Sequence, residues 1–256
     1  MELNQSSNAT NRSTNAKRKE IIEKKAVVDR AIKTACAEKD HLSAFPAFRC
    51  YHRNGLSVLL ESGRGDKLSS AVKKYIPNLL KLNMEGPYGP EWPMEEKVKR
   101  KEMVAHEARY IFVYEALCSS AFESSISSEA KRIFTNSMTE RGSIVGFVNY
   151  RFVIEEEIPV LYVYELQLEH RVQGKGLGNF LMQLIELIAQ KNHMGAVLLT
   201  VQKANLGAMS FYMSKLRYKI SASSPSRVDP SMGSEKSYEI LCKTFSPEAK
   251  AIFDSE

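Results

Sequence analysis

The stretch EHRVQGKGLGNF, residues 169–180, places three glycines within five positions, between a β-rich run and an apolar helical run. Glycine adopts backbone conformations that other residues avoid, and it adds no Cβ to the surface. The first turn of a helix leaves backbone N–H groups unpaired and carries partial positive charge. Arg171 and Lys175 bring cationic side chains to the same turn. This junction therefore predicts a site for an anionic group such as a phosphate.

The glycine spacing excludes the two commonest nucleotide-binding loops. A P-loop requires Gly-Lys followed by Ser or Thr, whereas Gly174-Lys175 is followed by Gly176. A dinucleotide fingerprint requires a third glycine where this chain has Asn179, and an acidic residue about 20 positions later at the end of a second strand. The pattern that remains is Arg171-x-x-Gly174-x-Gly176 between a strand and a helix.

The periodicity of the rest of the chain predicts one mixed α/β domain over residues 44–246. Strands are expected at 56–62, 109–117, 143–154, 160–170, 196–202 and 237–245. Helices are expected at 69–85, 94–104, 179–192 and 206–216, the first of them kinked or divided at Pro77. Residues 86–93, GPYGPEWP, contain three prolines and two glycines and predict a shaped loop without regular structure.

The flanking segments have a different composition. Residues 1–16 are rich in Asn, Ser and Thr and predict a disordered tail, and residues 247–256 are expected to form a C-terminal tail. Residues 118–142 are serine-rich and predict an insertion, since loops of that length are uncommon within a compact domain. Residues 17–43 predict a basic amphipathic helix, which either packs on the domain or contacts a nuclear-import factor or nucleic acid.

Composition limits the compartment and the metals. The net charge of +6 mildly favours anionic ligands. The four cysteines form no CxxC pair, so no metal site is expected. No apolar run reaches the roughly 18 residues of a membrane helix, the N-terminus has no signal-peptide core, and Glu2 excludes N-myristoylation. The sequence therefore predicts a nuclear or cytosolic protein that is not in a membrane.

Two motifs resemble those of the GNAT acetyltransferases. Arg171-x-x-Gly174-x-Gly176 is similar to their acetyl-CoA pyrophosphate loop, and 205–212, Asn-Leu-Gly-Ala-Met-Ser-Phe-Tyr, is similar to the N-x-x-A-x-x-[FL]-Y helix that follows the next strand. The resemblance implies an α/β GNAT acyltransferase fold: a central, mixed, twisted sheet flanked by helices, here with an N-terminal helical extension. It also implies acetyl-CoA as the cofactor.

A closer resemblance covers residues from about 44 to 245. The segments AFPAFRCYHRNGL, LYVYELQLE, GKGLGNFLMQL, LLTVQKANLGAMSFY, SSPSR and SYEIL are similar to the NatD-type N-terminal acetyltransferases. That family acetylates the N-terminal α-amine of histones four and two-A, which begin Ser-Gly-Arg-Gly. The resemblance implies histone tails as partners, a nuclear and cytoplasmic location, no need for direct nucleic-acid binding, and action without an auxiliary subunit.

The resemblance also assigns roles by position. Glu165 is the implied general base, and Tyr212 is an implied proton donor to the leaving thiolate. The implied cofactor-binding residues are Leu166, Gln167, Leu168, Arg171, Val172, Gln173, Gly174, Lys175, Gly176, Leu177, Gly178, Asn205 and Tyr212. The implied substrate-binding residues are Tyr88, Trp92, Glu155, Tyr162, Tyr164, Thr200, Ser223, Ser224, Ser226 and Tyr238.

Several questions stay open at the level of sequence. Residues alternate across a strand, so Glu165 faces away from Tyr164 unless a bulge re-aims it. Tyr212 also fits a core aromatic residue, and Trp92 also fits a hydrophobic plug beneath a loop. Val153 stands where the family tends to have an acidic residue. The substrate's amine or its arginine is then expected to be held by Glu155, Glu156 or Glu165. Besides histone acetylation, acetylation of another amine and a catalytically inactive binding module remain alternatives.

Overall fold

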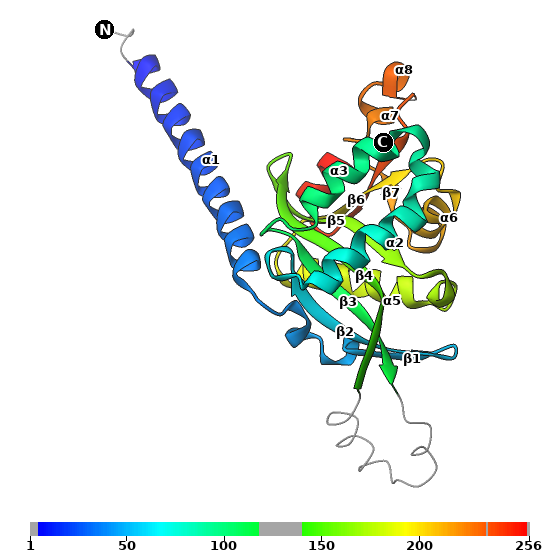
Figure 1. Ribbon diagram of the computed structural model, residues 1–256. Helices are drawn as coiled ribbons and strands as arrows, with labels where there is room; N and C mark the ends of the chain where they lie inside the picture. Colours follow the sequence, from blue (N-terminus) through cyan, green and yellow to red (C-terminus); the bar gives the residue numbers. More distant parts are fainter. Residues whose placement is uncertain (1–4, 118–139, 234, 255–256) are drawn as a thin grey trace.

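One mixed β-sheet carries the domain in the computed structural model, which describes residues 5–117, 140–233 and 235–254. Within those residues, eight strands lie side by side in the order β1-β2-β3-β4-β5-β6-β8-β7 (Figure 1). Their bounds are β1 (Cys50–Arg53), β2 (Leu56–Arg64), β3 (Arg109–Leu117), β4 (Glu140–Glu155), β5 (Ile158–Leu168), β6 (Ala196–Gln202), β7 (Lys219–Ile220) and β8 (Tyr238–Thr244). Neighbouring strands are antiparallel except β5 and β6, which are parallel.

Helices cover both faces of this sheet. Their bounds are α1 (Gln5–Ala37), α2 (Ser70–Tyr88), α3 (Trp92–Glu102), α5 (Leu177–Lys191), α6 (Leu206–Ser210), α7 (Pro225–Val228), α8 (Pro230–Gly233) and α9 (Pro247–Phe253). The short helical turns are η1 (His41–Ala44), η2 (Pro46–Phe48), η3 (Gly65–Lys67), η4 (Gly89–Glu91), η5 (His170–Val172) and η6 (Phe211–Lys215). None of the helices within the described ranges has the length and apolar character needed to cross a membrane.

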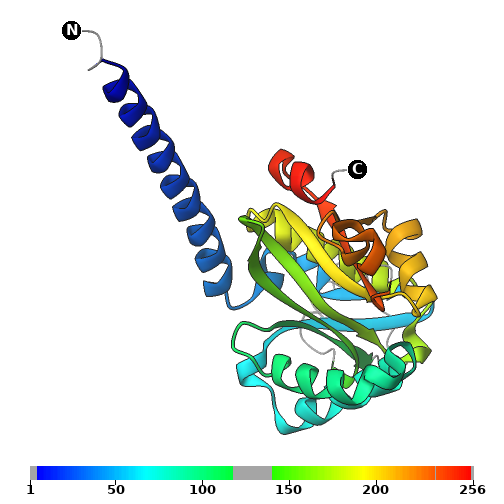
Figure 2. The ribbon, with the colours of Figure 1, turned by 90° about the horizontal axis from the view of Figure 1, so that it is seen from above.

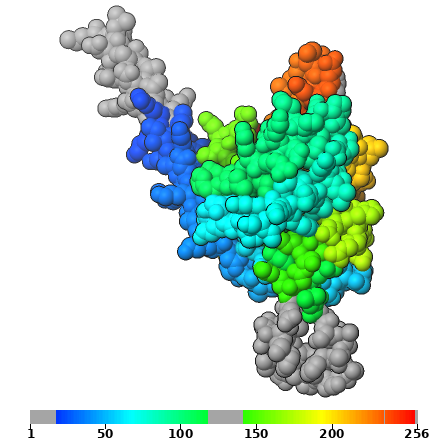
Figure 3. Space-filling view, in the orientation of Figure 1, coloured from blue at the N-terminus to red at the C-terminus, as the bar shows by residue number. Residues whose placement is uncertain are grey.

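The two faces of the sheet bury separate apolar clusters. Helix α5 packs its apolar stripe, which includes Leu181 and Ile185, against alternate residues of β5 and β6 such as Leu161 and Val197. Helices α2 and α3 pack on the opposite face, against residues of β3 and β4. Their residues form much of the front of the space-filling view (Figure 3).

The N-terminal helix α1 extends away from the domain, and it contacts β4 and β5 (Figure 2). Near its end, Ala35 is buried, and Ile32 packs against the main core. Farther up the helix, Ile21, Ile22 and Val27 are exposed. The helix begins at Gln5, so residues 5–16, which composition predicted to be disordered, are helical in the structure.

Three further segments differ from the sequence predictions. Residues 86–93 continue α2 to Tyr88, form the turn η4 and start α3 at Trp92. The prolines near the starts of η4 and α3 are compatible with helix because proline is tolerated in the first turn. Gly89 (φ 54°) reverses the chain between the two helices. The predicted helix 206–216 is an α-helical turn followed by a π-helical turn, η6. The predicted insertion 118–142 lies outside the described residues except for its last three, which belong to β4.

The predicted C-terminal tail instead forms a docked helix, α9. The Ser246 side chain accepts a hydrogen bond from the Ala249 N–H and caps its first turn. Phe253 is completely buried against an apolar cluster that includes Val160 and Leu198. The segment is short and half polar, so the sequence alone did not separate a docked helix from a tail.

We expect Phe253→Ala to destabilise the domain by about 3–5 kcal/mol, because it removes a buried aromatic ring and leaves a cavity. Urea unfolding of the variant and of the unchanged protein measures this difference. Ile252→Ala is the matched control, since Ile252 is 36% exposed and its loss should cost much less. Equal losses for the two variants would contradict a structural role for α9.

Candidate active site

Strands β5 and β6 pair over only part of their lengths. Residues 160–163 of β5 pair with residues 196–199 of β6. Beyond these positions β5 continues beside β4 to Leu168, and β6 continues beside β8 to Gln202. Among the described residues, the two facing edges therefore diverge, and backbone polar groups of both strands border the gap.

A cavity of about 580 Å³, here called the long cavity, extends from this gap to the first turn of α5. Most of the predicted cofactor-binding positions line it: Leu166, Gln167, Leu168, Gln173, Gly174, Gly176, Gly178, Asn205 and Tyr212. The structure thus brings together, from β5, the turn and α6, residues that the sequence separates by more than forty positions. A space of this size fits an extended ligand.

The glycine turn presents backbone N–H groups to the long cavity. Gly174 (φ 71°) and Gly176 (φ 89°) adopt the left-handed conformation, in which the turn reverses into α5. The carbonyl of Lys175 is held by β1 and its turn, because it accepts hydrogen bonds from Tyr51 Oη (2.6 Å) and Asn54 Nδ2 (2.8 Å). The N–H groups of the first helical turn have no partner within the helix and bear partial positive charge. The turn can therefore bind an anion through its main chain.

Side chains of this turn contribute less than the sequence suggested. The Arg171 guanidinium is paired with Glu115 and with Glu169 (2.7 Å), so its charge is already compensated. Val172 and Leu177 are buried in the main core and fix the turn to the domain. None of these three predicted cofactor-binding positions is among the residues that line the long cavity.

A β-bulge in β5 re-aims Glu165. Asn149 of β4 lies opposite Glu165 and Tyr150 lies opposite Val163, so Tyr164 is an extra residue between them. As a result, Tyr164 and Glu165 both line the same space beneath α3. The alternation conflict in the sequence is resolved by this bulge.

Polar groups from three elements hold the Glu165 carboxylate. Lys99 of α3 donates to Oε1, and Gln167 Nε2 donates to Oε2 (2.8 Å). Gln167 Oε1 in turn accepts from Asn83 Nδ2 of α2 (2.9 Å). The side chains of Lys99 and Glu165 are each only 12% exposed. Burial by itself lowers the pKa of Lys99, but the charge of Glu165 and then Tyr88 raise that pKa by more, so the ammonium stays charged.

A second, smaller cavity of about 90 Å³, here called the short cavity, adjoins Glu165. Tyr88, Tyr164 and Thr200 also line it. Asn205 and Tyr212 line both cavities and so mark their junction. Burial first, and then the charge of Glu165, raise the pKa of Tyr212, so its phenol remains protonated and able to donate.

Asn205 caps helix α6 at this junction. Its Oδ1 accepts from the Ala208 N–H (3.1 Å), which satisfies one unpaired group of the first helical turn. Its Nδ2 group remains as a donor at the wall of both cavities. The residue can therefore bind a ligand carbonyl while it holds the start of α6.

Tyrosines from β5 border the outer part of the site. Tyr162 and Tyr164 have ring centroids 5.4 Å apart, and Tyr162 Oη lies 2.6 Å from Thr200 Oγ1. The Arg151 guanidinium stacks 4.3 Å from the Tyr164 ring centroid. Glu155 lies at the end of β4, where burial and then Glu156 raise its pKa.

Trp92 and Tyr88 are placed differently from each other. Trp92 is 3% exposed and packs in the cluster beneath α2, with its ring centroid 5.8 Å from that of Tyr88. Its Nε1 is buried without a hydrogen-bond partner. Tyr88 lines the short cavity. Trp92 therefore supports the site from below, whereas Tyr88 contributes to its wall.

The predicted serine loop is tied to a buried carboxylate. Ser224 Oγ and Ser226 Oγ donate to Glu239 Oε2 at 2.6 and 2.7 Å, and Lys203 Nζ lies 3.2 Å from Glu239 Oε1. Ser223 Oγ instead lies 2.8 Å from Ser221 Oγ. These hydroxyls hold the loop beside Tyr238, which precedes Glu239 in β8. Their contacts in the structure are internal.

Four residues of the site carried no clear signal in the sequence: Tyr51, Asn54, Asn83 and Lys99. Asn83 and Lys99 lie in helices that contain other polar and charged residues, and nothing in their spacing distinguishes them. Tyr51 and Asn54 come from the first hairpin, more than 100 positions before the turn that they hold. Only the arrangement of the strands in the sheet brings Tyr51 and Asn54 to the glycine turn.

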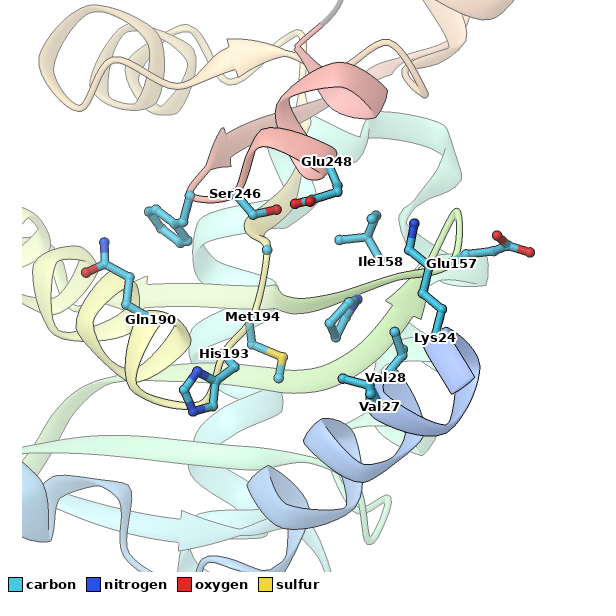
Figure 4. Close-up of a pocket in the computed structure, with 13 residues that line it drawn as sticks. Lys24, Val27, Val28, Glu157, Ile158, Gln190, His193, Met194, Ser246 and Glu248 are labelled. Atoms are coloured by element: carbon cyan, nitrogen blue, oxygen red, sulfur yellow. The ribbon is translucent and has the colours of Figure 1, made fainter. Parts of the chain in front are cut away.

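Another hollow, of about 660 Å³, lies away from the glycine turn (Figure 4). It separates the α1 residues Lys24 and Val28 from the β5 start at Ile158 and from Glu248 of α9. Neither the residues of the glycine turn nor Glu165 are among its lining side chains. It is a space between α1 and the domain, separate from the long and short cavities.

Comparison with known proteins gives one family and a set of similar folds. Residues 91–216 match the sequence model of the Acetyltransferase (GNAT) family. The PaiA N-acetyltransferase of Thermoplasma acidophilum in complex with coenzyme A is 15% identical at a TM-score of 0.45, with 73% of this chain and 99% of that chain covered. Naa50 of Arabidopsis thaliana in complex with the bisubstrate analogue CoA-Ac-MVNAL is 17% identical at a TM-score of 0.44, with 73% and 99% covered. NAA60 of the same plant in complex with a bisubstrate analogue is 9% identical at 0.45, with the same coverage.

We expect Glu239→Gln to loosen the serine loop and destabilise the protein by about 1–3 kcal/mol at pH 7. Burial raises the pKa of Glu239, but hydrogen bonds from Ser224, Ser226 and Lys203 lower it by more. A folded pKa below the unfolded value of roughly 4.3 means that the stabilisation is present above that pH and is lost as pH falls through the folded pKa. Urea unfolding from pH 7 to pH 3 should show that the free energies of unfolding of the unchanged protein and of Glu239→Gln converge. The control is Glu235→Gln, at an exposed site. A difference in the free energy of unfolding between Glu239→Gln and the unchanged protein that grew on acidification would contradict this explanation.

Proposed function

We propose that this chain, which contains a GNAT acetyltransferase domain, is an N-alpha-acetyltransferase. It moves the acetyl group of acetyl-CoA to the free N-terminal amine of histone tails beginning Ser-Gly-Arg-Gly. The long cavity holds the coenzyme, with its diphosphate on the N–H groups of the glycine turn. The short cavity receives the peptide's first residue. Solved structures of similar fold contain coenzyme A or bisubstrate analogues, which accords with this arrangement.

One observation carries the proposal: the long and short cavities meet at Tyr212 and Asn205, beside the Glu165 carboxylate. A coenzyme that lies along the open edge of β5 pairs its amide groups with the N–H and C=O groups that β6 no longer reaches. Its thioester then lies at the junction. An amine in the short cavity approaches the thioester from the side of Glu165.

The residues at the junction fit direct acetyl transfer. The α-amine, whose ordinary pKa is roughly 7.7–8.0, gives up a proton to Glu165, directly or through a water molecule. Its nitrogen forms a bond to the thioester carbon, and a β5 backbone N–H near Leu166 stabilises the oxygen that becomes negative. The nitrogen loses its second proton as the carbon–sulfur bond breaks, and this proton replaces, through a water molecule, the one that the Tyr212 phenol supplies to the leaving thiolate. Glu165 then returns its proton to solvent. The glycine turn keeps the coenzyme in place throughout.

The surroundings of the short cavity favour a small first residue followed by basic ones. Its volume of about 90 Å³ suits serine better than methionine. Glu155 and Glu102 act on the tyrosines that border the opening, and they supply negative charge for an incoming arginine or lysine. Glu91, three residues after the cavity residue Tyr88, accepts a hydrogen bond from Ser237 Oγ (3.1 Å) and adds a further carboxylate on that side. Val153 packs against the apolar cluster beneath α9. Recognition of the basic residues of the substrate therefore depends on these carboxylates.

The alternative functions fit the same geometry to different degrees. Acetylation of a lysine or small amine uses the same thioester chemistry and differs only in what enters the short cavity. A catalytically inactive binding module has no use for a carboxylate held from α2, α3 and β5 at the junction. With histone tails as substrate, the protein acts in the nucleus and cytoplasm and uses this one chain without an auxiliary subunit.

An assay of three peptides separates these functions. With acetyl-CoA, we expect a peptide beginning SGRGK to gain one acetyl group, while MLGPE and N-acetylated SGRGK stay unchanged. Mass spectrometry of each peptide measures the outcome, and Glu165→Gln should reduce turnover by roughly 10²-fold or more, the usual contribution of a general base. Acetylation of the blocked peptide would indicate lysine chemistry and reject the proposed function. Coenzyme binding without any transfer would indicate an inactive module.

Gly176→Ala should weaken coenzyme binding roughly tenfold or more. At φ 89° an alanine is strained by about 1–3 kcal/mol, and its Cβ would lie 2.8 Å from Tyr51 Oη, which holds the Lys175 carbonyl. Isothermal titration calorimetry with coenzyme A measures the effect. Gly86→Ala is the control, because that glycine lies in α2 with ordinary φ and open space around it. Unchanged affinity in Gly176→Ala would place the diphosphate elsewhere.

A further inference from the structure

Lys99 is a buried cation within a helix of exposed charges. Its neighbours Lys97, Arg100 and Lys101 on α3 are exposed to solvent, whereas the Lys99 side chain is only 12% exposed. Its Nζ donates to Glu165 Oε1 and lies 5.4 Å from the centroid of the Tyr88 ring. Burying an ammonium costs free energy unless it is paired, so this placement has to be compensated by its contacts.

The contact fixes the direction of the carboxylate. One oxygen of Glu165 accepts from Lys99 and the other from Gln167, which is held by Asn83. Glu165 is thereby anchored from α3, from α2 and from its own strand. A carboxylate held at both oxygens has little freedom to turn away from the junction of the long and short cavities.

The contact also sets the charge around Glu165. The charged and titratable groups that surround it come from every neighbouring element: Lys99 and Glu102 of α3, Tyr88 of α2, Tyr110 of β3, Arg151 of β4, Tyr164 of β5 and Tyr212 of η6. Among these described groups, only Lys99 is a cation in direct hydrogen-bond contact with Glu165. The tyrosines remain neutral, and Glu102 adds negative charge. Without this cation, the buried carboxylate would have no charged hydrogen-bond partner among these groups.

We propose that Lys99 is the positioning residue of the general base: its ammonium compensates the charge of Glu165 and keeps the carboxylate aimed at the junction where amine and thioester meet. This inference rests on the proposed function, in which Glu165 receives the proton of the amine. Lys99 also lines the short cavity, and the role proposed for it is exercised through Glu165. Its fixed positive charge also opposes a second cation beside the carboxylate, which favours release of the proton from the incoming amine.

The kcat and KM values with the SGRGK peptide and acetyl-CoA test this role. In Lys99→Met the carboxylate loses its charged partner and one of its two anchors, so kcat should fall roughly tenfold or more while the KM for acetyl-CoA stays within about twofold. Lys99→Arg, which keeps the charge and a donor, should retain most of the turnover. Lys97→Met, on the exposed side of α3, should change neither quantity.

Two further measurements keep a folding defect separate from the inference. Lys99→Gln retains a donor for Glu165 without its charge, and its kcat should fall in the same direction as that of Lys99→Met. Thermal unfolding and coenzyme A binding identify any variant that fails to fold. An unchanged kcat in both folded variants would overturn the inference, as would an equal loss in Lys99→Arg.

A double variant distinguishes an action through Glu165 from an independent one. If Lys99 acts through Glu165, adding Lys99→Met to Glu165→Gln should lower turnover little beyond the loss in Glu165→Gln alone, and losses that multiply overturn the inference. If the unchanged protein leaves SGRGK unmodified but acetylates another amine, the histone substrate is wrong. The same double variant assayed on that amine then tests the role of Lys99.

Discussion

The gap between β5 and β6 is the feature on which the rest of the site depends. Two parallel strands that stay paired would satisfy each other's backbone groups and leave no edge for a ligand. Here the pairing stops after residues 160–163, while β4 and β8 continue to support the outer edges. The open edge of β5, the first turn of α5 and the start of α6 then surround the long cavity. A binding site of this kind requires no side-chain charge of its own.

The bulge at Tyr164 turns this gap into a reactive site. Without it, Glu165 would face α5 and the main core, where an ionised carboxylate is costly. With it, Glu165 points beneath α3, where Lys99 and Gln167 satisfy both of its oxygens. A one-residue irregularity in a strand thus decides whether this carboxylate is buried against apolar groups or available to a proton.

Hydrogen bonds at a distance from the junction hold these parts in register. Tyr51 and Asn54 bind the carbonyl of Lys175 and so support the glycine turn from the far end of the sheet. Asn83 connects α2 to Gln167, and through it to Glu165. The docked helix α9 buries Phe253 beneath β5 and β6, on the part of these strands that remains paired. The site therefore depends on side chains from both ends of the chain's folded region.

Periodicity and glycine chemistry were enough to predict much of this protein. The strands 109–117 and 196–202 have the predicted bounds, and the glycine turn lies between a strand and a helix as expected. The predicted fold class, a GNAT fold with a mixed sheet flanked by helices and an N-terminal helix, is confirmed. These features are local, because a strand, a helix or a left-handed glycine is determined by residues within a few positions.

Tertiary structure decided what local rules leave open. The bulge arises from how β4 pairs with β5, and alternation alone predicted the opposite face for Glu165. Arg171 carries a positive charge next to the glycine turn, yet two carboxylates brought in by the fold compensate it. Lys99 is indistinguishable from its neighbours in sequence, and the packing of α3 over β5 alone buries it beside Glu165. Sequence by itself determined the elements and the anion-binding turn, whereas contacts between distant residues determined which charges remain available, because electrostatics depend on burial and on neighbours in space.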